Sequence, residues 1–61
     1  MLYYRLNLAN GESLHLESKT SLTDDQVFDE LVFAKELTLA DKEEVQGVET
    51  ISEEDYEEAM F

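Results

Sequence analysis

Apolar and polar residues alternate along the first part of the chain. The even-numbered positions from 2 to 8 are Leu, Tyr, Leu and Leu, and positions 14 and 16 are again Leu. A β-strand places every second side chain on the same face. Each of these two stretches is therefore predicted to be a strand with one apolar and one polar face.

The two predicted strands meet at Asn10 and Gly11, a pair that strongly favours a hairpin turn. A two-residue turn would pair even positions with odd ones and put the leucines of the second strand on the wrong face of the sheet. A three-residue loop, residues 9–11, avoids this if Gly11 takes the left-handed conformation of a bulge. The loop predicts two facing pairs, Leu6 with Leu14 and Tyr4 with Leu16.

A helix is predicted at about residues 24–35. Thr23 is the expected N-cap, and Gln26, three residues later, completes a capping box. Two aspartates in the first turn suit the positive end of the helix dipole. The apolar face of this helix consists of Val27, Phe28, Leu31 and Ala34. Phe33 points away from that face, so we expect it to be covered by the C-terminal segment or exposed to a partner.

The region after this helix fits two interpretations. Leucines at positions 37 and 39 alternate with Thr38, and Val45–Ile51 is typical of a strand with a bulge at Gly47. Together these two stretches would form a second hairpin, which is the preferred interpretation. The alternative is a short helix over residues 39–46, capped by Thr38 and ended by Gly47.

The C-terminal segment begins with a second capping pattern, in which Ser52 would cap a short helix and Asp55 would be its third residue. Tyr56, Ala59 and Met60 would share one face of that helix. Because the segment is short, it needs packing or a partner to remain helical.

These elements predict the fold class α+β. We expect a β-hairpin–helix–β-hairpin (ββαββ) domain over residues 1–51, followed by an acidic C-terminal segment, residues 52–61. A chain of 61 residues is one small domain with a thin core. It contains no Cys, which favours a reducing compartment, and it has no apolar run long enough for a membrane span and no signal-peptide pattern. We expect a cytoplasmic protein.

Charge is the most unusual property of the composition. Sixteen acidic residues stand against four basic ones, which gives a formal net charge of −12, and the acids are densest after residue 40. Such a charge repels nucleic acid and anionic membranes and attracts basic surfaces. We therefore expect no direct nucleic-acid or membrane binding, and we expect a partner with a basic surface.

The sequence offers little to catalysis. His15 is the only His, it belongs to the polar positions of its strand, and we expect it on the solvent side. The chain has no Cys nucleophile and no glycine-rich phosphate loop. Acids at positions 24, 25 and 29 lack the spacing of a calcium-binding loop. We predict that the protein is not an enzyme and has neither a cofactor nor a metal site.

The remaining hypothesis is that carboxylates dock on a basic groove, such as that of a nuclease or another nucleic-acid-binding protein. Nearby aromatic and apolar side chains would supply desolvated anchors. The chain is short and acidic, and its C-terminal segment contains the run Glu53-Glu54-Asp55-Tyr56-Glu57-Glu58. In these features it resembles small acidic proteins of phages and mobile elements, many of which inhibit host nucleases or other defence proteins. This resemblance implies an anti-defence inhibitor or modulator. The predicted partner-binding residues are Glu49, Glu53, Glu54, Asp55, Tyr56, Glu57, Glu58, Met60, Phe61 and Phe33.

An alternative hypothesis is a structural or assembly module. A short sheet leaves strand edges unpaired, and a small core gains from oligomerisation. Under this hypothesis the chain forms a homodimer through Leu2–Leu8 or Val45–Ile51, or adds a strand to a larger partner.

Overall fold

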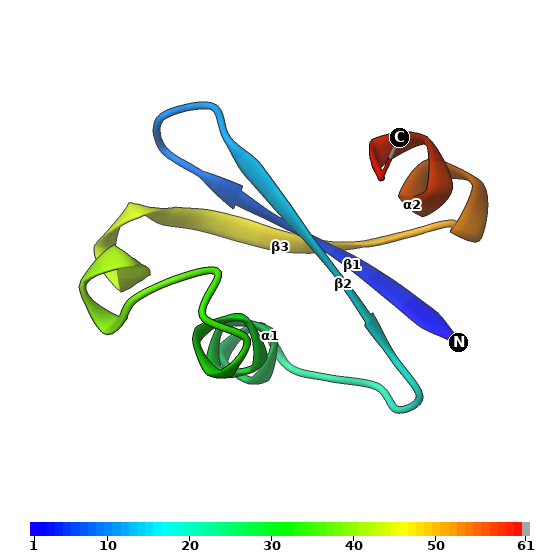
Figure 1. Cartoon of the computed structure of the whole chain (residues 1–61), viewed down its shortest axis with the longest axis horizontal. Helices are drawn as coiled ribbons and strands as arrows, with labels where there is room; N and C mark the ends of the chain where they lie inside the picture. The colour runs from blue at the N-terminus through cyan, green and yellow to red at the C-terminus, as the bar shows by residue number, and fades with distance from the viewer. Residues whose placement is uncertain (61) are drawn as a thin grey trace.

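The computed structural model describes residues 1–60 and has a mixed α+β fold built on a three-stranded antiparallel sheet (Figure 1). The strand order is β2-β1-β3, so β1 is central and is paired on both sides. The elements in chain order are β1 (Leu2–Leu8), β2 (Ser13–Ser18), α1 (Asp24–Phe33), a 3-10 segment η1 (Leu39–Glu44), β3 (Val45–Ile51) and α2 (Glu53–Ala59).

The predicted first hairpin and its loop are confirmed. Tyr4 faces Leu16 and Leu6 faces Leu14, which leaves residues 9–11 as the three-residue loop. Gly11 has φ 89°, in the left-handed region that favours glycine. The register therefore follows from the requirement that the leucines of both strands share one face.

Helix α1 begins as predicted. The Thr23 hydroxyl accepts from the backbone N–H of Gln26 at 3.2 Å, and the Gln26 side chain accepts from the N–H of Thr23 at 2.9 Å. The expected end at residue 35 is wrong, because the helix stops at Phe33 and Ala34 is its exposed C-cap. Lys35, directly after this cap, has φ 65°, and the N–H of Glu36 then donates to the carbonyl of Leu31 at 3.0 Å, which closes the end of the helix.

The core lies between α1 and one face of the sheet. It contains Val27, Phe28 and Leu31 from α1, as the apolar pattern predicts, but not the predicted Ala34. The hydroxyl of the buried Tyr4 accepts from the backbone N–H of Leu22 at 2.9 Å, which satisfies its polar end inside the core. The other buried members are Leu6, Leu8 and Leu37.

The preferred second hairpin is wrong, and with it the ββαββ order. Leu37 is 6% exposed but Leu39 is 73% exposed, so the two leucines do not line one face of a strand. The chain instead turns through η1, where the Asp41 carboxylate accepts from the N–H and hydroxyl of Thr38 at 2.9 and 3.1 Å. This agrees in part with the alternative of a short helix capped by Thr38. Segment η1 begins after Thr38, but it is a 3-10 helix that ends at Glu44, and Gly47 lies within β3 instead of ending a helix.

Strand β3 has the predicted bounds but pairs with β1 instead of with residues 37–39. Leu8 faces Val45 and Asn7 faces Gly47, so Gln46 is the extra residue of a bulge beside Gly47. The bulge thus lies where the glycine predicted it. It brings Val45 and Val48 against the core despite their odd spacing in the sequence.

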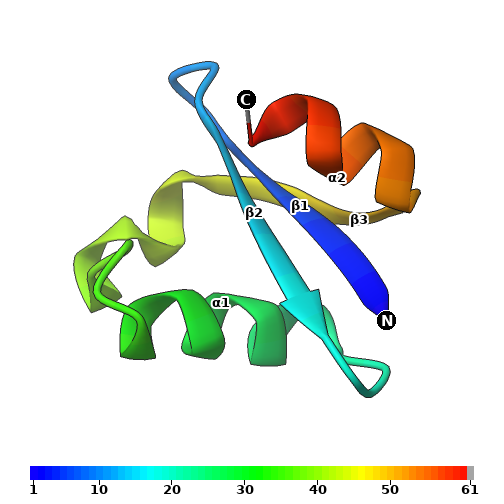
Figure 2. The same ribbon diagram turned by 45° about the vertical axis from the view of Figure 1, so that its right-hand side comes forward.

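Residues 52–60 of the C-terminal segment are a folded part of the molecule. Helix α2 lies on the face of the sheet opposite α1 and contacts β1 (Figure 2). The Ser52 hydroxyl accepts from the N–H of Asp55 at 3.1 Å, as the capping pattern predicts. Within residues 1–60, no helix is long and apolar enough to cross a membrane.

Candidate functional site

Helix α2 is anchored to the sheet by one aromatic side chain. The ring of Tyr56 packs on that of Tyr3, with the centroids 4.7 Å apart, and meets the ring of His15 edge-on at 6.4 Å. No residue of α2 is fully buried. Because a helix of seven residues is unstable alone, these contacts are the main reason that α2 has a fixed position.

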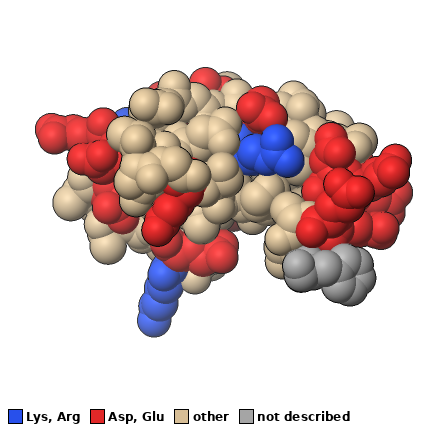
Figure 3. Space-filling model, turned by 90° about the horizontal axis from the view of Figure 1, so that it is seen from above, with Lys and Arg blue, Asp and Glu red and all other residues tan. Residues whose placement is uncertain are grey.

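The acidic residues of α2 are presented to solvent. All five carboxylates are exposed, and within residues 1–60 their side chains make no ion pair or side-chain hydrogen bond. Acidic side chains gather at the end of the molecule that α2 occupies (Figure 3). The five are Glu53, Glu54, Asp55, Glu57 and Glu58.

Carboxylates from β2, α2 and the turn after α1 surround the Tyr3–Tyr56 pair. Desolvation raises the pKa of the Tyr3 hydroxyl above its ordinary value, and the carboxylates of Glu53, Glu17 and Glu57 raise it further. The pKa of Tyr56 is raised in the same way, by desolvation and then by Glu17 and Glu36. Glu17 therefore belongs to the acidic surface around α2.

A polar network lies on the α2-facing side of the sheet. Arg5 Nη1 donates to Glu49 Oε1 at 3.0 Å, and Asn7 Nδ2 donates to the other oxygen of Glu49 at 3.2 Å. Arg5 Nε donates to His15 Nε2 at 3.2 Å. A guanidinium can only donate, so His15 accepts as a neutral ring. Burial, followed by the charge of Arg5, lowers the pKa of His15.

His15 therefore differs from the sequence-based expectation of a solvent-side residue. It is half-buried because Tyr56 lies beside it, and its Nε2 is occupied by Arg5. Arg5 is itself paired with Glu49, so His15, Arg5 and Glu49 form one connected polar network.

The structure separates the predicted partner-binding residues into three groups. The α2 carboxylates and Met60, which is 63% exposed, lie together at one end. Tyr56 and Glu49 are engaged with the sheet. Phe33 is 87% exposed on α1, across the sheet from α2, so it is not an anchor beside the acidic helix. Phe61 lies outside the described residues.

One residue of the acidic surface, Glu17, was missing from the sequence-based set. The signal was present, because the predicted three-residue loop pairs Glu17 with Tyr3. What the sequence could not supply was the position of α2 above that pair.

A second group of charged residues surrounds the start of α1. A shallow pocket of about 210 Å³ is lined by Asp24, Asp25, Phe28, Lys42 and Val45. The ammonium of Lys42 lies 3.5 Å from Asp25 and 5.6 Å from the ring centre of Phe28.

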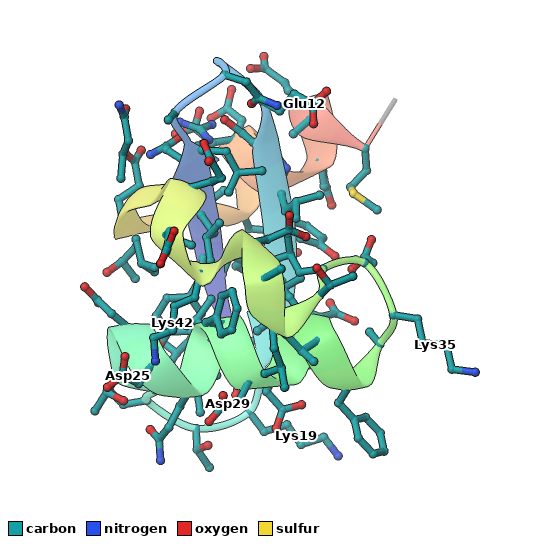
Figure 4. The ribbon with its side chains drawn as sticks, turned by 90° about the vertical axis from the view of Figure 1, so that its left-hand side faces the viewer. Glu12, Lys19, Asp25, Asp29, Lys35 and Lys42 are labelled. Atoms are coloured by element: carbon teal, nitrogen blue, oxygen red, sulfur yellow. The ribbon has the colours of Figure 1, made fainter. Side chains whose placement is uncertain are left out.

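The basic side chains do not form a patch. Lys42 lies beside Asp25, whereas Lys19 and Lys35 extend away from the body of the protein (Figure 4). Within residues 1–60, no group of three His, Cys, Asp or Glu side chains converges to hold a metal ion.

Comparison with known proteins gives no relative. No family model matches the chain, and neither a curated protein nor a solved structure matches it. The functional argument therefore depends on the geometry alone.

Proposed function

We propose that this protein is an acidic protein-binding inhibitor or modulator, which docks helix α2 on a basic surface of its partner. The observation that carries the proposal is that five exposed, unpaired carboxylates stand on a seven-residue helix fixed by Tyr56. A basic groove that binds nucleic acid is the expected target, and occupation of that groove is the expected mode of inhibition.

The fixed position of α2 matters for affinity. A disordered acidic tail must be ordered when it binds, and this ordering reduces the net binding free energy. Carboxylates that are already held on a folded helix avoid much of that loss. Met60, exposed beside them, supplies an apolar contact of the kind that charge alone lacks.

The proposal is tested by competition for basic nucleic-acid-binding proteins, including nucleases, against labelled nucleic acid. We expect displacement at low salt that weakens as the ionic strength rises, because exposed charges are screened beyond about 10 Å at 0.1 M salt. Absence of displacement from every basic protein, at any salt concentration, would contradict the proposal.

A matched pair of variants tests whether α2 is the binding surface. Changing Glu53, Glu54, Glu57 and Glu58 to Gln is expected to weaken binding by at least about fourfold, since each exposed pair contributes roughly 0.2–1 kcal/mol and four are removed. The control removes the same number of charges from α1 and η1. It consists of the changes Asp29→Asn, Glu30→Gln, Glu43→Gln and Glu44→Gln. Equal losses in both variants would show that only the net charge matters.

A small assembly module is the second candidate function. It is favoured by the two outer strands of the sheet, β2 and β3, each paired on one side only within residues 1–60. Light scattering after gel filtration separates the two candidates. A stable dimer that is indifferent to salt favours assembly, whereas a monomer favours the docking of α2 on a basic partner.

A further inference from the structure

Strand β2 is an outer strand of the sheet, and the edge that faces away from β1 presents an uninterrupted row of backbone donors and acceptors. The backbone N–H of Leu8 donates to the carbonyl of Glu12 at 2.9 Å. Leu8 and Glu12 are therefore a hydrogen-bonded pair. In an antiparallel ladder such pairs alternate with non-bonded pairs, so the next bonded pairs are Leu6 with Leu14 and Tyr4 with Leu16. The even-numbered residues of β2 thus direct their backbone groups toward β1. The N–H and C=O groups of Ser13, His15 and Glu17 consequently point outward in the plane of the sheet, away from β1. No backbone hydrogen bond joins them to another described segment.

The other outer strand is less suited to pairing. In β3 the bulge at Gln46 interrupts the register with β1. A bulge bends a strand and breaks its row of donors and acceptors, which blunts an edge. Strand β2 has no such shift, and its pairing with β1 is continuous from Leu2↔Ser18 to Asn7↔Ser13.

The two faces beside the β2 edge differ in chemistry. On the α1 side, Leu14 and Leu16 are partly buried and pack against the core. On the α2 side, Glu17 is exposed opposite Tyr3, where the carboxylates of α2 also act on the Tyr3 hydroxyl. A strand added to this edge thus has the apolar Leu14 and Leu16 on one face, and on the other face the polar Ser13 and His15 together with the acidic Glu17.

We propose that β2 binds an extended basic segment of a protein partner as a fourth strand, with apolar side chains alternating with Lys or Arg. This inference rests on the proposed function, because it names the part of the basic partner that docks. The apolar side chains extend the row formed by Leu14 and Leu16, and the basic side chains lie on the face of the sheet that carries Glu17 and, over β1, α2. Backbone hydrogen bonds supply affinity, and the alternation supplies specificity.

The net charge of the protein favours a basic segment over a second copy of the chain as the added strand. Each copy carries −12. Pairing β2 with itself about His15 places both α2 helices and both Glu17 side chains on the same face of the joined sheet, where like charges repel. A basic strand places opposite charges there instead.

The first test uses two synthetic peptides of equal composition, one alternating Val and Lys and one with the Val and Lys residues in separate blocks. Backbone amide exchange is followed by NMR on the full chain. With the alternating peptide, the amides of Ser13, His15 and Glu17 should exchange at least about tenfold more slowly. The amides of Leu14 and Leu16, which already face β1, should not change. The block peptide should bind about tenfold more weakly, since it cannot satisfy both faces.

The second test removes one outward donor without removing charge. A chemically synthesised chain with an N-methyl group on Glu17 should bind the alternating peptide about tenfold or more weakly. Circular dichroism checks that this chain is folded. The matched control, Glu17→Gln, keeps the donor and should lose less affinity, and the difference from the native chain should vanish in high salt.

The outcomes separate this inference from the proposed function. If both peptides bind with equal affinity and only α2 amides respond, strand addition is wrong while docking through α2 stands. If no basic peptide or protein binds at any salt concentration, both proposals fail. If the three outward amides become protected simply by raising the protein concentration, the occupant is a second copy and the proposal is overturned.

Discussion

Replacing Tyr56 by Ala should release α2 from the sheet while leaving the α1 side of the molecule folded. Full burial of an aromatic side chain contributes roughly 1.5–3 kcal/mol, so the half-buried Tyr56 contributes about 1 kcal/mol. Its pairing with the Tyr3 ring at 4.7 Å adds about 1 kcal/mol. The total, about 2 kcal/mol, is most of what holds a seven-residue helix that has no fully buried residue.

The assay is NMR. In Tyr56→Ala, the Cα shifts of residues 53–59 should move to disordered values, while the shifts of β1, β2 and α1 remain. The free energy of global unfolding, measured with urea, should fall by no more than about 2 kcal/mol. Tyr56→Phe is the matched control, because it keeps the ring and should retain the helix. A helical α2 with unchanged amide exchange in Tyr56→Ala would refute the reasoning that this ring anchors it.

Two further predictions concern the hairpin beneath α2. Because the folded state lowers the pKa of His15 below its ordinary 6.5, the unfolded chain takes up this proton first. The free energy of unfolding of the native chain, minus that of His15→Gln, should therefore fall as the pH drops from 6.5 through the pKa of His15 in the folded state. If this difference does not depend on pH, folding does not shift the pKa of His15 and the reasoning is refuted. Gly11→Ala should destabilise the protein by about 1 kcal/mol in urea unfolding. No atom would block the added Cβ within 4 Å, but φ is 89°, so an unchanged midpoint would refute the positive-φ argument.

The sequence predicted the structure best where local interactions restrict each other, as the apolar face of two strands and the turn between them do. The leucines of the first two strands exclude a two-residue turn, which would put them on opposite faces, and Gly11 favours the three-residue loop that is observed. The start of α1 was equally clear because Thr23 and Gln26 satisfy each other's backbone N–H groups. In both cases the deciding interactions lie within a few residues along the chain.

The prediction failed where the deciding interactions were distant or lacked a residue signature. Lys35 takes a left-handed conformation that usually falls to glycine, so nothing in the sequence marked the early end of α1. Leu37 and Leu39 look equivalent in an alternating pattern, yet only Leu37 reaches the core. The partner of β3 depends on the central position of β1, which no local pattern encodes.

Only part of the candidate site could be predicted from the sequence, because the rest depends on contacts between distant residues. The density of carboxylates after residue 52 and the Ser52 cap can be read from the sequence. The separation of Phe33 from those carboxylates, and the capture of Glu49 by Arg5, depend on the sheet that lies between α1 and α2. Long-range packing thus decides which acidic residues are free to meet a partner.

Charge and shape can be separated experimentally because each depends on different residues of α2. The Tyr56→Ala variant keeps all five carboxylates but removes the contact that fixes their positions. The fourfold Glu→Gln variant removes four charges but keeps the Tyr56 anchor. If a partner recognises only negative charge, the first variant should bind almost as well as the native chain, and only the second should weaken. If the partner needs the carboxylates at fixed spacing, both variants should weaken, and only the binding that survives in Tyr56→Ala reflects charge alone.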